Sequence, residues 1–282
     1  MYLELDPALK ADLPEDADSF EWFLEAQGIT HREVKHRLTY EAHLGEHHIF
    51  VKRHLGCGWG EVFKEWYRLR KPVVSARTEW EGAAILEKAG LNVPRVLGKG
   101  ERGSYPHSVE SFVVLGALED CETLEHFKEG WLGFEGTRWM ELKRSLISEV
   151  ASMCHTMHGC GINHRDLYIN HFLVNRNLIQ ACSPDNLPPL HLIDLHRVQK
   201  RSHVPDRWLQ KDLSALLFSA LDTGLTSTDC IRFLRVYLGA NWKADLRGRE
   251  KLWQRIVRKA ISLYIGFHGK APILPKLLSQ ET

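Results

Sequence analysis

The stretch INHRDLYINHFLV, residues 162–174, is the most informative part of this 282-residue chain. A long segment ending at Gly159 comes before it, with apolar residues at helical spacing, and the short apolar run HFLV closes it. The sequence therefore predicts a polar loop between a helix and a strand. Asp166 and His171 lie five residues apart on this loop, so one short segment carries both a carboxylate and an imidazole.

The tripeptide His164-Arg165-Asp166 is typical of the catalytic loop of kinases. Phosphoryl transfer needs a carboxylate that accepts the proton of the acceptor hydroxyl, and ligands that hold Mg²⁺ on the phosphates of ATP. Asp166 matches the carboxylate. His171 stands where kinases usually have an asparagine ligand, although imidazole is a less typical ligand of Mg²⁺ than an amide oxygen.

Further charged residues occur in the order that a kinase requires. Asp194 ends the apolar run LHLID, where a kinase has its metal-binding aspartate, but Leu and His replace the usual Phe and Gly. Lys52 ends the run HHIFVK and matches the lysine that contacts the ATP phosphates. Its partner is expected to be Glu79 or Glu81, and only one of them can face inward because residues two apart on a helix point different ways.

The order of the expected elements predicts an α+β, two-lobed, protein-kinase-like fold. Strands come first, including a hairpin of LTYEAHL and HHIFVKRH around Gly45, and a helix over 75–90. Helical periodicity dominates after Gly116. We therefore predict a small antiparallel-sheet lobe over residues 1–116, which binds ATP, and a larger helical lobe over 117–282 with the catalytic loop, metal site and acceptor site.

Asp212 lies beside the apolar stripe of a helix predicted over 207–222. A partly buried carboxylate needs hydrogen-bond partners, and backbone amides of the HRD loop are expected to supply them. The alternative is an ordinary aspartate on the helix surface.

Composition indicates a globular protein, with 44% hydrophobic and 26% charged residues and a formal net charge of +1. The acidic start has no signal-peptide core, and no stretch approaches the roughly 20 apolar residues of a membrane span. The six cysteines are therefore expected to be reduced, cytoplasmic thiols. The segment CHTMHGC (154–160) has metal-ligand residues but not the spacing of a closed zinc site. No nucleic acid is expected as a partner.

Residues 242–276 carry nine Lys and Arg against two acidic residues, interleaved with Trp242, Trp253, Tyr264 and Phe267. A basic, aromatic helical segment of this kind can bind an anionic membrane surface. The alternative is a solvated helix face whose aromatic residues pack inward.

Several motifs together resemble one family: HRDLYINHFLV, IDLHRVQ, RWLQKDLSALLFSALDTGLT, HLGCGWGEVFK and SARTEW. They are similar to the lipopolysaccharide core heptose kinases, specifically the heptose(I) kinase group of the Kdo/heptose kinase family, from about Leu38 to about Leu238. The resemblance implies an ATP- and Mg²⁺-dependent phosphotransferase with an alcohol acceptor, a heptose hydroxyl of the inner-core glycolipid in a Gram-negative bacterium. It also implies a cytoplasmic protein, peripheral at the inner face of the inner membrane.

The resemblance assigns roles to the residues of both motifs. Asp166 is implied to be the catalytic base. His164 and Arg165 complete its motif, and we expect Arg165 to offset phosphate charge during transfer. Asp194 is implied to hold Mg²⁺, and His171 stands where the family also has histidine, which makes it the second metal residue.

The same comparison places Lys52 on the ATP phosphates and favours Glu79 over Glu81 as its partner. Asp212 matches the Lys-Asp helix of the family and is implied to support the catalytic loop.

One departure leaves the acceptor sugar open. Heptose(I) kinases commonly have cysteines on either side of the loop tyrosine, where this chain has Leu167 and Asn170. A paralogue that acts on a second heptose or another core sugar is therefore an alternative. So are a kinase for an aminoglycoside, choline or another sugar, and a catalytically inactive kinase-like protein that binds a membrane or a partner.

Overall fold

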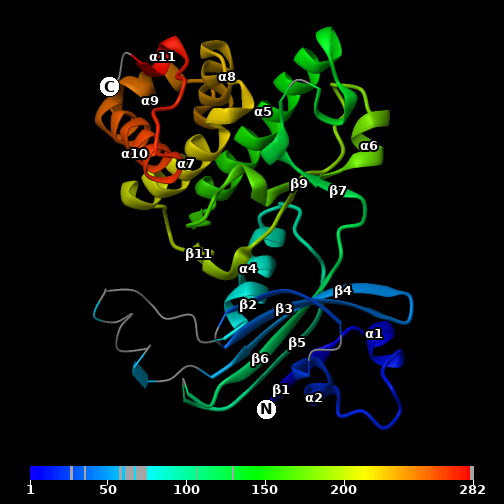
Figure 1. Ribbon diagram of the computed structural model, residues 1–282. Helices are drawn as coiled ribbons and strands as arrows, with labels where there is room; N and C mark the ends of the chain where they lie inside the picture. Colours follow the sequence, from blue (N-terminus) through cyan, green and yellow to red (C-terminus); the bar gives the residue numbers. More distant parts are fainter. Residues whose placement is uncertain are drawn as a thin grey trace. The chain divides into compact units, whose positions relative to one another are not determined.

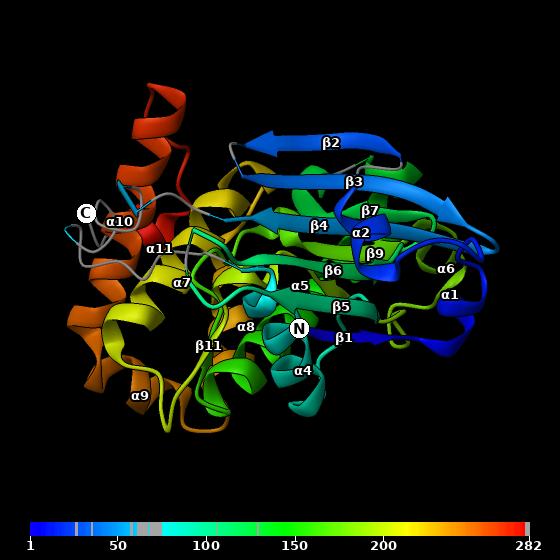
Figure 2. The ribbon, with the colours of Figure 1, turned by 90° about the horizontal axis from the view of Figure 1, so that it is seen from below.

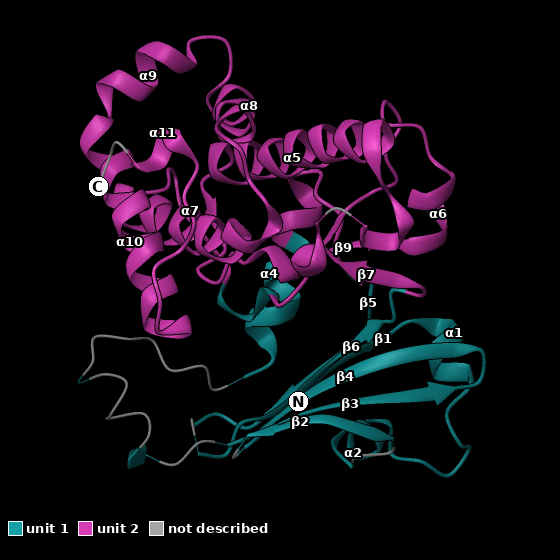
Figure 3. Cartoon of the chain, turned by 45° about the horizontal axis from the view of Figure 1, so that its top comes forward, with its two compact units in different colours: residues 1–84, 94–118, 195–197 teal, residues 85–93, 119–194, 198–282 magenta. Residues whose placement is uncertain are grey.

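A computed structural model describes residues 1–25, 28–34, 36–56, 59–60, 67, 75–105, 107–128 and 130–279. The chain divides into two compact units, which are described separately (Figures 1 and 3). The first contains residues 1–84, 94–118 and 195–197, and the second contains residues 85–93, 119–194 and 198–282.

The first unit is built on a six-stranded antiparallel sheet with the strand order β1-β5-β6-β4-β3-β2. The hairpin predicted around Gly45 is present, and Gly45 has the positive φ of +55° that its tight turn requires. The strands are β1 (Tyr2–Leu5), β2 (Ile29–Val34), β3 (Arg37–Leu44), β4 (His47–Leu55), β5 (Val96–Arg102) and β6 (Glu110–Gly116).

The two faces of this sheet pack against different helices. One face carries Tyr40, Ile49 and Val51 and packs against α1 (Pro7–Ala11) and α2 (Ser19–Leu24), which lies over the strands in Figure 2. The opposite face packs against α4 (Arg77–Lys88) through Val113, Leu115 and Phe50, which meet Ala76 and Trp80. Since side chains alternate along a strand, Lys52 lies on the same face as Phe50.

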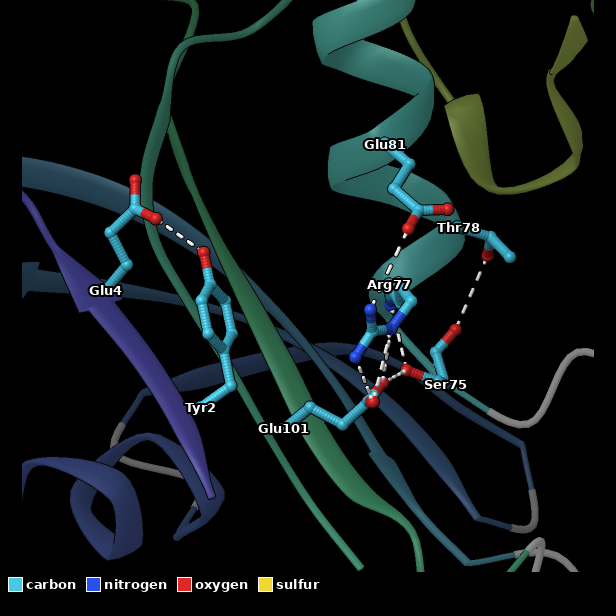
Figure 4. Close-up of polar contacts among 7 residues, drawn as sticks. All are labelled: Tyr2, Glu4, Ser75, Arg77, Thr78, Glu81 and Glu101. Atoms are coloured by element: carbon cyan, nitrogen blue, oxygen red, sulfur yellow. Dashed lines mark hydrogen bonds and ion pairs between the residues drawn. The ribbon is translucent and has the colours of Figure 1, made fainter. Parts of the chain in front are cut away.

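Ion pairs fasten the start of α4 to the sheet (Figure 4). The Arg77 guanidinium donates to Glu101 of β5, with Nη2 to Oε1 at 2.5 Å, and the Ser75 hydroxyl donates to the same carboxylate. The Ala76 amide donates to the Ser111 hydroxyl on β6 at 2.9 Å. These contacts fix the first turn of α4, which contains Glu79.

The N-terminal region adds further elements to the predicted lobe. Asp18 caps α2 by accepting from the Phe20 amide at 2.8 Å, and the helix ends at Leu24. Strands β1 and β2 were not predicted. Parts of the motif HLGCGWGEVFK, at residues 57–58 and 61–64, lie outside the described residues.

His54 of β4 is a buried titratable group whose side chain is only 9% exposed. Burial lowers its pKa to about 3, and the nearby positive charges of Arg37, His196 and Lys52 act in the same direction. The unfolded chain takes up a proton at this histidine below its ordinary pKa of 6.5, whereas the folded chain does not. The neutral His54 side chain therefore makes its full contribution to the free energy of unfolding above pH 6.5, and this contribution is lost as the pH falls toward 3.

We expect this one histidine to cost about 2 kcal/mol of unfolding free energy between pH 8 and pH 5. Urea unfolding at both pH values measures the loss, and His54→Gln should reduce it by that amount. His36→Gln, at an exposed histidine, is the control. Equal losses in wild type and His54→Gln would contradict the assignment.

The second unit is mainly helical. Helix α5 packs against α8, and α7 packs against α10 (Figure 1). The apolar stripe predicted for α7 is buried through Leu209, Leu213 and Leu216. The helices are α5 (Gly136–Gly159), α6 (Arg176–Ala181), α7 (Asp206–Ala220), α8 (Ser227–Leu238), α9 (Trp242–Gly248), α10 (Glu250–His268) and α11 (Lys276–Ser279).

Two small antiparallel sheets complete this unit, with the orders β10-β9-β7 and β11-β8. Gly161 links α5 to β8 with a φ of +75°, and a Cβ at this position would collide with the Arg201 carbonyl. Only glycine therefore fits at the start of the loop that leads to His164. The strands are β7 (Cys121–Thr123), β8 (Ile162–Asn163), β9 (Phe172–Asn175), β10 (His191–Leu192) and β11 (Gln199–Lys200).

Among the described cysteines none forms a disulfide, and Cys57 lies outside the described part of the chain. Within the same residues, no helix combines the length and the apolar character needed to span a bilayer.

Candidate active site

The HRD loop is anchored by Asp212 of α7, which is completely buried. Its Oδ2 accepts from the His164 amide at 2.7 Å, and its Oδ1 accepts from the Arg165 amide at 2.7 Å. Each carboxylate oxygen thus satisfies one backbone donor that would otherwise be buried without an acceptor. The partners are those expected from the sequence.

Helix α5 adds a second layer behind this anchor. The His158 ring lies 3.4 Å from Asp212 through Nε2 and 2.8 Å from the Tyr237 hydroxyl of α8 through Nδ1. The neighbouring His155 contacts the Tyr237 carbonyl oxygen through Nδ1 at 2.7 Å. Both histidines of the CHTMHGC segment therefore connect α5 to α7 or α8.

The imidazole of His164 is also fully buried. Its Nε2 donates to the Ile193 carbonyl oxygen at 3.1 Å, which ties the HRD loop to the residue before Asp194. Burial lowers the pKa of His164, so the ring is neutral near pH 7. A buried, neutral ring in this place orients the loop and does not face solvent.

The Asp166 carboxylate is partly accessible to solvent, with 15% of its side chain exposed. The Lys211 ammonium of α7 lies 3.7 Å from its Oδ1. The Arg165 guanidinium stands 4.8 Å from the centroid of the Trp208 ring, in a cation–π arrangement. Residues adjacent in the sequence thus have different surroundings, because the Arg165 guanidinium packs on Trp208 whereas the Asp166 carboxylate lies near Lys211 and stays partly accessible to solvent.

His171 and Asp194 lie close together at the other end of the loop. The His171 Nδ1 is 2.8 Å from the Asp166 carbonyl oxygen, and this oxygen can only accept, so Nδ1 carries the proton. In the neutral ring Nε2 then carries the lone pair, and this atom lies 3.8 Å from Asp194 Oδ2. This distance is too long for a hydrogen bond, and two acceptor atoms that face each other are a suitable pair of ligands for a cation.

The donor chemistry partly fits Mg²⁺. The carboxylate of Asp194 is a preferred ligand, whereas the imidazole of His171 is less typical and suits borderline metals better. These two side chains would hold the ion together with phosphate oxygens of the nucleotide.

Two residues of the site have a backbone conformation that side chains rarely adopt. The φ angle of Arg165 is +76° and that of Asp194 is +60°. Such conformations cost of order 1–3 kcal/mol each and persist where the surroundings enforce them. The contact of the Arg165 amide with Asp212 supplies that enforcement at the HRD loop.

Lys52 and Glu79 of the first unit contact each other. The Lys52 ammonium donates to Glu79 Oε1 at 2.8 Å, and Glu79 is buried at 3% exposure. The same oxygen accepts from the Leu195 amide at 3.2 Å. Glu81 instead lies near Arg77, with Nη1 and Oε1 3.9 Å apart, and its side chain is exposed (Figure 4). Of the two candidate partners, Glu79 is the one in contact with Lys52.

The sequence interpretation missed three residues of this arrangement. Lys211 precedes Asp212, and its position in the pair Lys-Asp was the available signal. His158 was considered only as a metal ligand, and Tyr237 was not considered. Their contacts depend on how α5, α7 and α8 pack, which no local pattern reports.

Comparison with known proteins agrees with the resemblance found in the sequence. Residues 21–237 match the model of the lipopolysaccharide kinase (Kdo/WaaP) family. The lipopolysaccharide core heptose(I) kinase WaaP of Pseudomonas aeruginosa is 41% identical over 247 residues, which cover 88% of this chain and 90% of that protein. The protein of the same name from Escherichia coli K12 is 36% identical over 222 residues, 79% of this chain and 82% of the relative.

A solved structure supports the same relationship. It is described as WaaP in complex with acyl carrier protein, and it has a TM-score of 0.77 and 37% identity. The alignment covers 94% of this chain and all of that one. The predicted α+β, protein-kinase-like fold is thereby confirmed. This chain belongs to the lipopolysaccharide kinase (Kdo/WaaP) family.

Proposed function

We propose that this protein is an ATP-dependent kinase that phosphorylates the first heptose of the lipopolysaccharide inner core. Its relatives at 35–41% identity all carry the name lipopolysaccharide core heptose(I) kinase. The alignments with these relatives cover 79–88% of this chain. The HRD loop lies within residues 21–237, which match the family model.

The observation that carries the proposal is the arrangement of residues 164–171. The loop is anchored through Asp212, leaves the Asp166 carboxylate accessible, and turns the free nitrogen of His171 toward Asp194. A protein that only bound a partner would need neither an accessible carboxylate beside two candidate metal ligands nor the strained backbone at Arg165 and Asp194.

In this proposal Asp166 accepts the proton of the heptose hydroxyl. The hydroxyl oxygen forms a bond to the γ-phosphorus of ATP while the bond between this phosphorus and the bridging oxygen breaks, and ADP leaves. Lys52, oriented by Glu79, binds the nucleotide phosphates. Mg²⁺ held by Asp194 and His171 offsets phosphate charge when it is bound. His164, Arg165 and Asp212 act as positioning residues.

The acceptor test compares ADP release with different substrates. We expect turnover with lipopolysaccharide core that lacks phosphate on the first heptose, and none with the same core already phosphorylated there. Equal turnover with both cores would assign the activity to another sugar. Turnover only with an aminoglycoside or choline would favour the alternative of a different small-molecule kinase.

We propose further that the protein works at the cytoplasmic face of the inner membrane. The described surface near the end of α10 exposes large apolar side chains, with Ile265 at 45%, Phe267 at 77% and Ile273 at 95%. Exposed basic residues lie on the same helix, at Arg255, Arg258 and Lys259. Apolar side chains beside basic ones suit a surface that contacts anionic lipid headgroups.

Replacing Arg255, Arg258 and Lys259 by Ala is expected to weaken binding to anionic vesicles about 100-fold, because each basic residue near a membrane contributes about 1 kcal/mol. Co-sedimentation with phosphatidylglycerol vesicles measures it. The control replaces the exposed Lys10, Lys88 and Lys128, which removes the same charge elsewhere. Equal losses in both triple variants would indicate non-specific attraction, and unchanged binding would leave α10 as a solvated helix.

A further inference from the structure

A cluster of imidazole and carboxylate side chains lies on the first unit, separate from Lys52 and Glu79. It consists of Glu41 and His43 on β3, His48 on β4 and His31 on β2. In the strand register His43 lies directly opposite His48, and Glu41 is two residues from His43 on the same strand. Side chains two apart on a strand share a face.

The packing of the sheet shows which of its two faces carries the cluster. Tyr40, Ala42 and Ile49 alternate with the cluster and are buried against α1 and α2. The cluster therefore lies on the opposite face, where solvent reaches it. The register of β2 shifts between Thr30 and Arg32, so His31 falls at an irregularity of the strand. A bulge of this kind changes the direction of a side chain, and here it brings His31 to Glu41.

The polar atoms of the cluster converge. Glu41 Oε2 is 2.5 Å from His31 Nε2, and Glu41 Oε1 is 2.7 Å from His48 Nε2. The rings of His43 and His48 stack with centroids 4.3 Å apart at 17°. One ligand atom from each of Glu41, His43 and His48 lies within 4.8 Å of the others.

We propose that Glu41, His43 and His48 form a binding site for Zn²⁺ or a similar first-row transition metal, with His31 as a fourth ligand or as a hydrogen-bond partner of Glu41. Two or three imidazoles and one carboxylate are the donor set of zinc sites, whereas Mg²⁺ prefers oxygen ligands alone. The site is thus chemically distinct from a magnesium site at Asp194. All four residues come from the neighbouring strands β2, β3 and β4 of one sheet.

Cobalt provides the probe, because Co²⁺ occupies zinc sites and its visible absorption reports the ligands. The full-length protein, first freed of metal with a chelator, is titrated with Co²⁺ in excess Mg²⁺. We expect one equivalent to bind with the intense visible bands of a four-coordinate nitrogen and oxygen site, and Zn²⁺ to bleach them. A near-ultraviolet thiolate band would instead place the metal on cysteines, and this result would overturn the proposal.

Variants locate the metal. His43→Ala and His48→Ala should each weaken Co²⁺ binding by more than about 100-fold, since loss of an outer partner alone costs about 10–100-fold. Glu41→Gln keeps the side-chain shape and should also weaken it, which covers the case in which a histidine variant fails to fold. His47→Ala is the matched control, because His47 neighbours the cluster in sequence but lies near Asp12 on the other face.

Unchanged affinity and spectrum in Glu41→Gln and in folded histidine variants would overturn the site, as would the absence of any cobalt binding by wild type. ATP binding, measured separately on the same variants, keeps this result independent of the proposed kinase activity.

Discussion

The variant Asp166→Asn should lower phosphoryl transfer by about 10²–10⁴-fold, the range that a general base contributes. An amide has nearly the same shape as the carboxylate but does not accept the proton of the acceptor hydroxyl. ATP binding should be retained, because the backbone of this loop is held through the amides of His164 and Arg165 and not through the Asp166 side chain. Single-turnover kinetics and calorimetric ATP titration measure the two quantities.

The control for this variant is Asp245→Asn, which removes a carboxylate from an exposed position of α9 and should leave turnover unchanged. A loss of ATP affinity parallel to the loss of turnover would show that Asp166 stabilises the loop. Turnover within a few-fold of wild type would remove Asp166 from the catalytic role.

The second large effect concerns stability. Asp212→Ala is expected to lower the free energy of unfolding by about 2–6 kcal/mol, because two buried amides lose their acceptor at about 1–3 kcal/mol each. The left-handed conformation of Arg165 also loses the contact that holds it. Urea unfolding measures the change. Activity should fall as well, since the loop no longer presents Asp166.

Asp212→Asn distinguishes the two carboxylate contacts. The asparagine oxygen still accepts one amide, but its NH₂ group faces the other amide, so an intermediate loss of stability is expected. Asp245→Ala again serves as the exposed control. If Asp212→Ala costs less than about 1 kcal/mol, the anchor does not hold the loop in solution.

Much of the fold follows from local patterns. The hairpin of β3 and β4 was predicted from alternating residues around Gly45, and α7 from its apolar stripe. Strand β2 was missed because its residues are all exposed, so the sequence ITHREV lacks the alternation of a half-buried strand. Helix α6 was missed for a related reason. It buries only Ile179 and begins at an Asn175 cap inside a polar segment.

The part of the candidate site that could be predicted consists of residues at a fixed spacing within one segment of the sequence. Asp166 and His171 belong to one loop, so their proximity follows from their spacing in the sequence. The contacts of Lys211, His158 and Tyr237 were not predictable in this way, because residues distant in sequence meet there only after the helices pack. The Glu41 cluster has the same origin, since strand register and a bulge bring His31, His43 and His48 together.

The most direct test of the proposed activity is transfer of labelled γ-phosphate from ATP to purified lipopolysaccharide core that lacks phosphate on its heptoses. Wild type is predicted to place the label on the first heptose, and Asp166→Asn to leave the glycolipid unlabelled while it still binds ATP. No label with wild-type protein that binds ATP and Mg²⁺ would contradict the assigned acceptor. Label of equal intensity with Asp166→Asn would contradict the assigned base.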